Sequence, residues 1–491
     1  MIIYLKNYFH LGIKMLSNYD IIILGGGTTG LVASKYAVLL GAKTLIIEAD
    51  RIGGDCTWTG CVPSKSLVFA SSLVKKTAEA IDLGFIEADY KVKFNAVKDY
   101  INKTVNDIYE EEKTEVLQRE GIDVLIGEAH FVSSKEVEVD GQRFRAKKFI
   151  IATGAKPIIP RKYIDGLDDV PYLSSDSIFG IPELPKHLLV LGAGPIGCEL
   201  SQAFKRLGSK VTLIDMMENI LPREHEEVSS ELESILKAEG IRLALGDPVK
   251  KVKQNAKGEI EVYTKTGNKL IGSDLLIAVG REPAIEKLCL EKAGVKVSNN
   301  EIILDKYLRT SKKHIYAAGD CVTQYKLTHI AGYQGYIAVR NALLPFNSKG
   351  MPKYISWTTF TDPEVAFAGK TDKINSIIRD EFEKHTLTNN QIDRSRMDNQ
   401  VDGFIQIYSS TKGKIIGASI VSSRAGELIH EFLLAMLNKT SISKIAKMVH
   451  SYPTYSMGNM QLAGNIVEKN IFQSYLGGFL KKISRIYRSY K

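Results

Sequence analysis

Two cysteines stand five positions apart in the segment GGDCTWTGCVPSK, at Cys56 and Cys61. Thiols this close can form a structural disulfide, supply half of a zinc site, or act as a redox pair that opens and closes. A zinc site needs about four ligands, and the chain has no second CxxC or HxxxH segment to supply the others. The segment therefore predicts no metal site and leaves a structural disulfide and a redox pair as alternatives.

The composition is that of a large folded protein in a reducing compartment. A chain of 491 residues with 44% hydrophobic and 25% charged residues has material for about two to four domains. Five cysteines in this length, with no secretory cleavage pattern at the start, predict a cytoplasmic location. In that setting a close cysteine pair is more often metal-binding or catalytic than structural.

The positive charge is concentrated at the C-terminal end. Of the net charge of +9, five charges lie in residues 471–491, which contain no acid. The rest of the chain is nearly balanced, which excludes a general nucleic-acid surface. Apolar and aromatic residues alternate with Lys481, Lys482, Arg485, Arg488 and Lys491 at helical spacing, which suits an anionic membrane surface. A solvated helix and packing on a dimer remain alternatives, and residues 1–18 are an extension to which we assign no function.

A glycine-rich turn follows the first apolar run. YDIIILGGGTTG predicts a strand that breaks into a turn, LVASKYAVLLGA a helix, and KTLIIEAD a second strand. Glycines allow a tight turn and bring backbone N–H groups close to a pyrophosphate at the helix N-terminus. An acid that ends the second strand can accept hydrogen bonds from a ribose. The residues concerned are Gly25, Gly27, Gly30 and Glu48.

The same pattern recurs in HLLVLGAGPIGCELSQAFKRLGSKVTLIDMME, and two copies predict two bound nucleotides. Its residues are Gly192, Gly194, Gly197 and Asp215. An acid at position 215 would repel a 2′-phosphate, so the second site is expected to prefer NADH, with NADPH as the alternative.

The remaining segments predict further strands and a change of architecture near residue 346. KKFIIATGAKPIIP, SDLLIAVGREPA and HIYAAGDCV are apolar strands that end in glycine, and residues 66–120 are largely helical. Beyond residue 346, GFIQIYSS and KIIGASIV predict antiparallel strands and AGELIHEFLLAML a helix. This part is therefore expected to be an α+β domain.

Taken together, these segments resemble the FAD-dependent pyridine nucleotide–disulfide oxidoreductases, the family of dihydrolipoamide dehydrogenase, glutathione reductase and mercuric reductase. The marks are GGGTTG, GGDCTWTGCVPSK, ATG, GAGPIGCE, AVGREP, AAGD and TDPEVAFAG. The resemblance implies an α/β fold with two Rossmann-type domains, for FAD and NAD, and a C-terminal α+β dimerisation domain. It implies an FAD domain at residues 19–160 and 281–345, an NAD(P) domain at 161–280, a dimerisation domain at 346–470 and a tail at 471–491.

The resemblance also assigns residues. The implied FAD contacts are Gly25, Gly27, Gly30, Glu48, Gly54, Lys65, Gly154 and Asp320. The implied NAD contacts are Gly192, Gly194, Gly197, Asp215 and Gly280. Lys65 and Glu199 should pair beside the flavin, where the lysine stabilises charge on the reduced ring. Cys61 should face the flavin and Cys56 the substrate, and a helix N-terminus with a nearby lysine should lower the thiol pKa.

The segment HSYPTYSMGN departs from the family pattern. Relatives of the dihydrolipoamide dehydrogenase type carry His-x-His-Pro-Thr and a later glutamate, where this chain has Tyr452 and Met457. Tyrosine, with a pKa near 10, is a poor base but can donate a hydrogen bond or help to bind a metal ion. His450 stands at the first histidine's position and is interpreted as structural. Tyr452 is similar to what mercuric reductases carry, but no cysteine follows Cys321 to receive Hg(II).

The expected function is that of a homodimeric FAD enzyme with Cys56, Cys61, Lys65, Glu199 and Tyr452 as catalytic residues. Electrons would pass from NADH through the flavin and the cysteine pair to a disulfide, a metal ion or another small-molecule acceptor such as a quinone, in the manner of mercuric reductase. The alternatives are a dihydrolipoamide dehydrogenase or glutathione-reductase-type disulfide reductase, and a non-catalytic flavoprotein redox sensor. The cytoplasmic location leaves peripheral contact with a membrane through residues 471–491 open.

Overall fold

A computed structural model describes residues 17–379, 382–410, 413–473 and 475–489. The extension before residue 17 and Lys491 in the tail therefore lie outside the described residues. The chain forms two compact units. The first contains the described residues of Met1–Ser66, Lys98–Ile158 and Gly280–Met351, and the second those of Leu67–Val97, Ile159–Val279 and Pro352–Lys491. The domain boundaries expected from the sequence stay a prediction.

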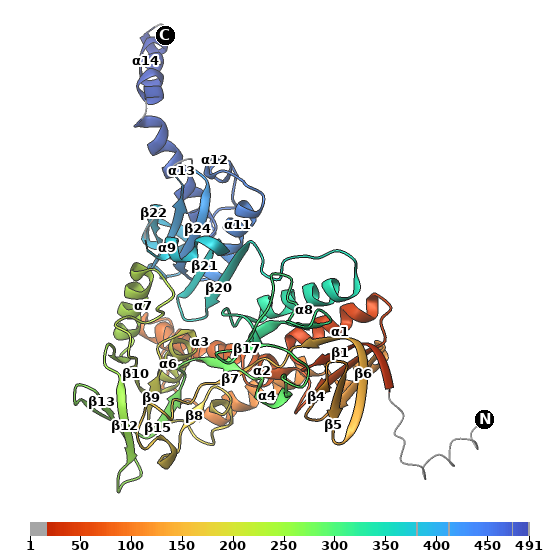
Figure 1. The fold of residues 1–491 in the computed structure, drawn as a ribbon. Coiled ribbons are helices and arrows are strands. Elements are labelled where there is room, and N and C mark those ends of the chain that lie inside the picture. The colour runs from red at the N-terminus through yellow and green to blue at the C-terminus, as the bar shows by residue number, and fades with distance from the viewer. Residues whose placement is uncertain (1–16, 380–381, 411–412, 474, 490–491) are drawn as a thin grey trace, which may run out of the picture. The chain divides into compact units, whose positions relative to one another are not determined.

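The first unit is built on a mixed sheet whose central strands are parallel (Figure 1). Its strands are β1 Ser17–Leu24, β2 Thr44–Glu48, β3 Ile122–Ile126, β4 His130–Ser133, β5 Glu136–Val139, β6 Gln142–Ile151 and β19 Ile315–Ala317. Ile21, Ile22 and Ile23 are fully buried in succession, which means that both faces of β1 are covered. Helix α1, Thr28–Leu39, connects β1 to β2 and packs against α8, Thr328–Leu343. The first predicted strand–helix–strand unit is confirmed.

Short elements complete this unit around the parallel strands. They are α2 Gly54–Trp58, α5 Thr114–Arg119, β7 Ala155–Pro157 paired with β16 Arg281–Pro283, and β17 Val297–Ser298 paired with β18 Glu301–Ile302. Two longer helices, α3 Cys61–Asp82 and α4 Phe94–Tyr109, each have residues in both units. The helical content expected between residues 66 and 120 is therefore present.

The second unit contains a parallel five-stranded sheet in the order β11-β10-β9-β15-β8. Its strands are β8 Leu173–Ser174, β9 His187–Leu191, β10 Lys210–Ile214, β11 Arg242–Ala244 and β15 Asp274–Ile277. Helix α6, Pro195–Leu207, connects β9 to β10; proline stands at its first turn and Gly208 ends it in the left-handed region. Helix α7, Glu226–Ala238, follows β10, and an antiparallel sheet is formed by β12 Val249–Gln254, β13 Ile260–Thr264 and β14 Lys269–Gly272. The second predicted nucleotide-binding unit is confirmed.

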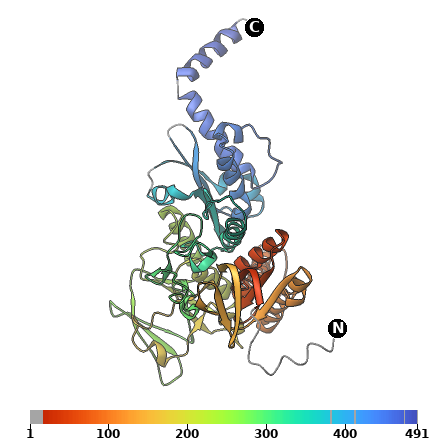
Figure 2. The ribbon, with the colours of Figure 1, turned by 45° about the vertical axis from the view of Figure 1, so that its right-hand side comes forward.

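The second unit also contains an antiparallel sheet in the order β20-β21-β24-β23-β22. Figure 2 shows this sheet and its helices in the teal and blue part of the colour range. The strands are β20 Tyr354–Thr359, β21 Glu364–Lys370, β22 Glu383–Thr388, β23 Phe404–Ser409 and β24 Ile415–Ser422. The helices are α9 Ile374–Ile378, α10 Asp393–Met397, α11 Ala425–Leu437, α12 Ile442–Ile445, α13 Met457–Phe472 and α14 Tyr475–Ser489. The predicted change to an α+β arrangement is confirmed. Among the described helices, none has the length and apolar character needed to cross a bilayer.

Candidate functional site

The turn after β1 brings helix α1 against the backbone of the turn itself. Gly25 has a φ of +115°, and a Cβ on Gly30 would lie 1.9 Å from the Gly25 carbonyl oxygen. Only glycine fits such an approach, so the spacing of these two residues follows from sterics. The N-terminus of α1, which begins after Gly27, is thereby held at the end of the strand, where its unpaired N–H groups can bind phosphate.

Glu48, at the end of β2, holds this turn in place. Its Oε2 accepts a hydrogen bond of 2.6 Å from the Gly26 amide, and its Oε1 accepts one of 2.9 Å from the Asp50 amide. A carboxylate oxygen has two lone pairs, so each oxygen keeps one for a ribose hydroxyl. The expected ribose-binding residue is therefore also a structural part of the turn.

Two buried polar atoms without a partner lie at the same edge of the sheet. Thr153 follows β6 and Asp320 follows β19, and Thr153 Oγ1 and Asp320 Oδ1 accept or donate no hydrogen bond among the described residues. Because β1, β6 and β19 are parallel neighbours, their carboxyl ends share one edge with the glycine turn. Leaving a buried polar atom unpaired costs about 1–3 kcal/mol, so this edge has the form of a polar ligand's site.

The expected FAD therefore fits the first unit. Burial raises the pKa of Asp320 to about 6, although the cations Lys326 and Arg281 oppose the shift. Gly27 and Gly54 also lie close together: a Cβ on Gly54 would lie 2.7 Å from the Gly27 Cα, so a larger residue would crowd the turn. Gly154, after β6, has a φ of +68° at the same edge. The bare backbone and the unpaired oxygens leave room and hydrogen-bonding capacity for a dinucleotide.

Cys56 and Cys61 come together at the N-terminus of α8. Cys56 lies in α2 and Cys61 is the first residue of α3. Both are free thiols, and the Thr328 hydroxyl lies 3.2 Å from Cys61 Sγ and donates a 3.5 Å hydrogen bond to Cys56 Sγ. Thr328 was missed in the sequence because it lies 267 positions from Cys61 and belongs to no recognised segment. The two sulfurs are thus available for a reversible disulfide.

The expected lowering of the thiol pKa is wrong for Cys56. A hydrogen bond with Cys61, burial and the nearby Cys61 charge all raise the pKa of Cys56 above its ordinary value. Hydrogen bonds from Thr328 and Thr28 act in the opposite direction but do not dominate. Two adjacent thiols cannot both ionise easily, because the second must form a thiolate beside the first. The reduced pair is therefore expected to lose its two protons in separate steps.

Helix α2, which carries Cys56, is fixed by its neighbours. The Arg281 guanidinium forms an ion pair with Asp55, and the Trp58 indole N–H donates a 2.8 Å hydrogen bond to the Ile52 carbonyl. Arg281 lies on β16, so the ion pair ties the cysteine-bearing helix to the β7–β16 ladder. Neither Asp55 nor Arg281 was a predicted site residue.

The structure leaves the predicted pairing of Lys65 with Glu199 untested. Lys65 lies on α3 in the first unit, one turn after Cys61, and Glu199 lies on α6 in the second unit. Glu199 is 5% exposed, and its Oε1 accepts a 2.8 Å hydrogen bond from the Phe360 amide. The pairing of Lys65 with Glu199 therefore stays a prediction.

The turn after β9 repeats the geometry of the first turn. Gly192 has a φ of +111°, and a Cβ on Gly197 would lie 1.8 Å from the Gly192 carbonyl oxygen. Asp215 Oδ2 accepts a 2.6 Å hydrogen bond from the Ala193 amide, and its Oδ1 accepts one of 2.8 Å from the Met217 amide. The N-terminus of α6, after Gly194, is therefore positioned for a second dinucleotide.

Gly280, the remaining predicted NAD contact, follows β15 with a φ of +131°. It is assigned to the first unit, whereas the β9 turn belongs to the second. Its contact with the nicotinamide nucleotide therefore stays a prediction.

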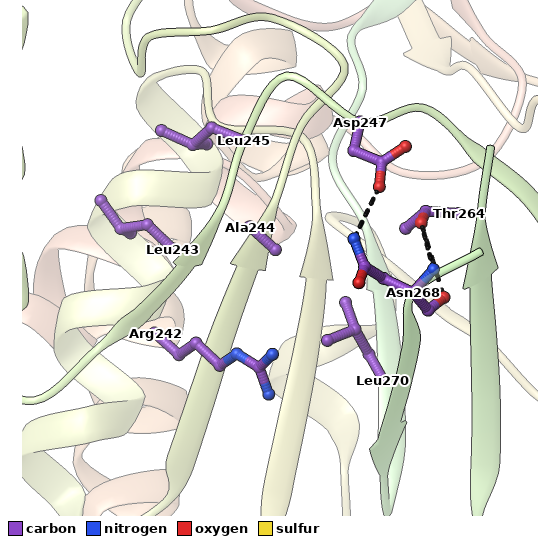
Figure 3. Close-up of a pocket in the computed structure, with 8 residues that line it drawn as sticks. All are labelled: Arg242, Leu243, Ala244, Leu245, Asp247, Thr264, Asn268 and Leu270. Carbon is purple, nitrogen blue, oxygen red and sulfur yellow. Dashed lines mark hydrogen bonds between the residues drawn. The ribbon is translucent and has the colours of Figure 1, made fainter. Parts of the chain in front are cut away.

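A pocket beside β11 contains none of the predicted site residues (Figure 3). Its polar wall is closed by Asn268, whose Nδ2 donates a 3.1 Å hydrogen bond to Asp247 Oδ2. Hydrogen bonds from the side chains of Thr264 and Thr266 contribute most to lowering the pKa of Asp247 to about 2. The carboxylate is thus already engaged with its own neighbours, and the pocket is not the candidate site.

In the C-terminal segment both ring nitrogens of His450 lie close to groups of the same chain. His450 Nδ1 lies 3.0 Å from the Met448 carbonyl, and Nε2 lies 3.2 Å from Glu431 Oε1. Asn459 Nδ2 donates a 2.8 Å hydrogen bond to the same glutamate. Tyr452 is 63% exposed and donates a long 3.4 Å hydrogen bond to Asp393. Because both ring nitrogens are engaged, the arrangement favours the structural interpretation of His450.

Comparisons with known proteins bear on this geometry. The family model described as pyridine nucleotide-disulphide oxidoreductase matches residues 19–335, and the model of that family's dimerisation domain matches residues 355–461. A mercuric reductase from Lysinibacillus sphaericus is 33% identical over 462 residues, which cover 93% of this chain and 84% of the relative. A dihydrolipoyl dehydrogenase from Thermus scotoductus is 31% identical over 462 residues, which cover 91% and 97%.

Solved structures of similar fold also cover most of the chain. The Cu(II) complex of the HOCl-induced flavoprotein disulfide reductase RclA from Escherichia coli superposes with a TM-score of 0.82 at 25% identity, covering 92% of this chain and 100% of that one. LpdA from Mycobacterium tuberculosis superposes with a TM-score of 0.81 at 27% identity, with the same coverage. The overall likeness therefore extends over both matched domains.

Proposed function

The chain belongs to the pyridine nucleotide-disulphide oxidoreductase family, and from this premise we propose that it reduces a soft metal ion with electrons taken from NADH. Members of the family depend on FAD and use NAD(P)H as the electron donor. The observation that carries the proposal is the convergence of Cys56 and Cys61 on the Thr328 hydroxyl. The matched dimerisation domain supports a homodimer as the working form.

Residues of the first unit would hold the FAD. The glycine turn and the N-terminus of α1 would bind the pyrophosphate, Glu48 a ribose, and Asp320 and Thr153 polar groups at the sheet edge. The chemistry that bound FAD supplies is the transfer of two electrons between NAD(P)H and a disulfide. Lys65 would stabilise negative charge beside it, with Glu199 as its partner.

The cysteine pair would perform the reaction with the acceptor. The ion binds to the two sulfurs as they lose their protons, which is favourable because thiolates are the ligands that soft metal ions prefer. The dithiol then gives up two electrons, the Cys56–Cys61 disulfide forms and two protons leave to solvent. The two electrons reduce one Hg(II) to neutral mercury, or two Cu(II) to two Cu(I). Electrons from NADH open the disulfide again, with the uptake of two protons.

The proton partners of the pair favour a metal ion over a disulfide acceptor. Reduction of a disulfide releases a thiolate that must be protonated, a task suited to an imidazole that titrates near neutral pH. Here Tyr452 stands at that position in the sequence, and both ring nitrogens of His450 are engaged within the chain. A metal ion needs no such proton. Within the described residues no cluster of three potential metal-ligating side chains is formed. We propose that the two sulfurs are the ligands.

The test is anaerobic turnover of the purified holoenzyme with NADH and a panel of acceptors. The panel contains Hg(II), Cu(II), lipoamide, oxidised glutathione and a benzoquinone. We expect NADH oxidation to be fastest with a metal ion and to be lost in both Cys56→Ser and Cys61→Ser. Faster turnover with lipoamide or glutathione would assign the protein to the disulfide reductases, and no turnover with any acceptor would favour a redox sensor.

A further inference from the structure

Helix α14, Tyr475–Ser489, separates apolar and basic side chains on opposite sides. Phe479, Ile483 and Ile486 follow the spacing i, i+4, i+7, which places them along one side of a helix. Lys481, Arg485 and Arg488 follow the same spacing two residues later. At 3.6 residues per turn, two positions correspond to about 200° of rotation, so the basic series lies opposite the apolar one.

The apolar side of α14 is exposed. Phe479 is 60% exposed, Ile483 45% and Ile486 49%, and Leu480 beside them is 41% exposed. Three large side chains in line, with a fourth beside them, form a continuous stripe and not scattered single residues. This stripe comes after residues 355–461, which the dimerisation-domain model matches, so the family assignment does not account for it.

The basic side of the same helix carries an unbalanced charge. Lys481, Lys482, Arg485 and Arg488 supply four cations, and residues 471–489 contain no acid. Lys481 lies 5.8 Å above the ring of Phe472 on α13, the helix that α14 follows and contacts. An exposed apolar stripe on a helix with four cations matches a lipid surface, which has an apolar interior beneath anionic headgroups.

The length of the helix decides how such a surface would be met. Fifteen residues extend about 22 Å, which is shorter than the hydrocarbon core of a bilayer, about 30 Å. The helix therefore matches an interfacial orientation, with the apolar stripe below the headgroups and the cations among them. Nucleic acid would pair with the cations and leave the stripe in water. A second copy packed stripe against stripe would cover the apolar side but leave the cations in water, so an anionic lipid surface fits both faces best.

We propose that α14 binds the surface of an anionic phospholipid bilayer and thereby attaches the enzyme to it. Phe479, Ile483 and Ile486 enter the interface, and Lys482, Arg485 and Arg488 bind lipid phosphates. This attachment uses none of the residues that we assign to electron transfer.

The experiment is flotation of the purified full-length holoenzyme with vesicles. One set consists of phosphatidylcholine alone and the other of equal parts of phosphatidylcholine and phosphatidylglycerol. We expect binding to the anionic vesicles to be at least about tenfold tighter and to weaken as salt is raised, because each cation near the surface contributes separately. Equal binding to the two sets, or binding to neither, would overturn the proposal.

Two variants separate the contributions of the faces. Phe479→Ser with Ile483→Ser removes apolar area, and Lys482→Glu with Arg485→Glu reverses charge; we expect each to reduce binding about tenfold or more. The matched control, Lys250→Glu with Lys251→Glu on β12, makes the same change in net charge at another exposed site and should bind like the wild type. Retained binding in both α14 variants would contradict the proposal.

Size-exclusion chromatography distinguishes a lipid from a second copy of the chain. The α14 variants are expected to elute at the same size as the wild type and to oxidise NADH at the same rate. A smaller particle in either α14 variant would make the stripe a subunit interface and would overturn the assignment to lipid.

Discussion

The turns after β1 and β9 are held by matching contacts, but different side chains lie beside them. In each turn a helix glycine approaches the carbonyl of the first glycine, and the acid at the end of the second strand accepts a backbone hydrogen bond of 2.6 Å. Beside the first turn stand the partly exposed thiols of Cys56 and Cys61. Beside the second stands Cys198, which is fully buried and 3.4 Å from the Ala193 carbonyl.

The two turns differ in the state of the thiols beside them. Burial raises the pKa of the Cys198 thiol far above its ordinary value and keeps it protonated, so that thiol is inert. The reactive pair lies in α2 and α3, which follow β2 in the first unit; after β10, the second unit continues to exposed Met216 and Met217. The strand–turn–helix has the geometry of a nucleotide site in both units, and the proposed redox pair is carried by the segment after the second strand of the first unit.

The largest expected effect comes from removing one thiol of the first unit. Cys61→Ser should lower kcat with any acceptor on the order of a thousandfold or more, because no disulfide can form and reopen. The bound FAD should stay at the wild-type amount, since the glycine turn is unchanged. Cys289→Ser, at a partly exposed cysteine outside the site, is the control and should turn over normally. If Cys61→Ser kept a tenth of the activity, the pair would not be the route to the acceptor.

The second prediction concerns alanine substitutions that disrupt each glycine turn separately. Gly30→Ala and Gly197→Ala both place a Cβ within 2 Å of a carbonyl oxygen, and shifting the helix costs about 1–3 kcal/mol. Gly30→Ala should be purified with less FAD, whereas Gly197→Ala should retain FAD and show a higher KM for NADH. Gly464→Ala, in α13 with open space around it, should change neither. Equal loss of FAD in both variants would contradict separate nucleotide sites.

A third prediction compares the buried acids of the two units. Burial raises the pKa of Glu224 to about 7, although a hydrogen bond from the Trp357 indole opposes the shift. The folded protein therefore retains a proton that the unfolded chain loses near its ordinary pKa of about 4.5, and stability falls as the pH rises between these two values.

Glu224→Gln should remove this pH dependence, because the amide cannot ionise. Relative to the wild type, the free energy of unfolding of the variant should rise by on the order of 1–3 kcal/mol as the pH increases from about 5 to about 8. The measurement is the difference in Tm between the two proteins at each pH. Asp320→Asn in the first unit tests the contrast: the difference in Tm between wild type and variant should change with pH, and that pH dependence should differ with and without bound FAD. A Tm difference for Glu224→Gln that did not change with pH would exclude a buried neutral carboxyl.

The smallest effect is expected at the acid that ends β10. Asp215→Asn keeps an oxygen for the Ala193 amide but removes the charge that repels a 2′-phosphate. The ratio of kcat/KM for NADH to that for NADPH should fall about tenfold, which corresponds to about 1.4 kcal/mol. Asp176→Asn, an exposed acid elsewhere in the same unit, should leave the ratio unchanged. A wild-type enzyme that already preferred NADPH would remove the basis of this prediction.

Both turns could be predicted from the sequence because their contacts are local. Each connects the residue after the first glycine of the turn with an acid 22 positions later, and the alternation of apolar strand and helix fixes that geometry. The neighbours of the thiols could not be predicted. Thr328 and Arg281 come from elements more than 200 positions away, and the lowered thiol pKa expected for Cys56 ignored the second thiol. Glu431, which contacts His450, lies on α11, 19 positions earlier, and has no sequence signal of its own.

Electrons from NADH are expected to arrive at Cys56 and Cys61. The most direct measurement is the alkylation of thiols in the oxidised holoenzyme before and after anaerobic addition of NADH, with the labelled cysteines identified by mass spectrometry. We predict that two further thiols per chain become reactive on addition of NADH and that they are Cys56 and Cys61. Labelling of these two cysteines that is the same with and without NADH would contradict the account.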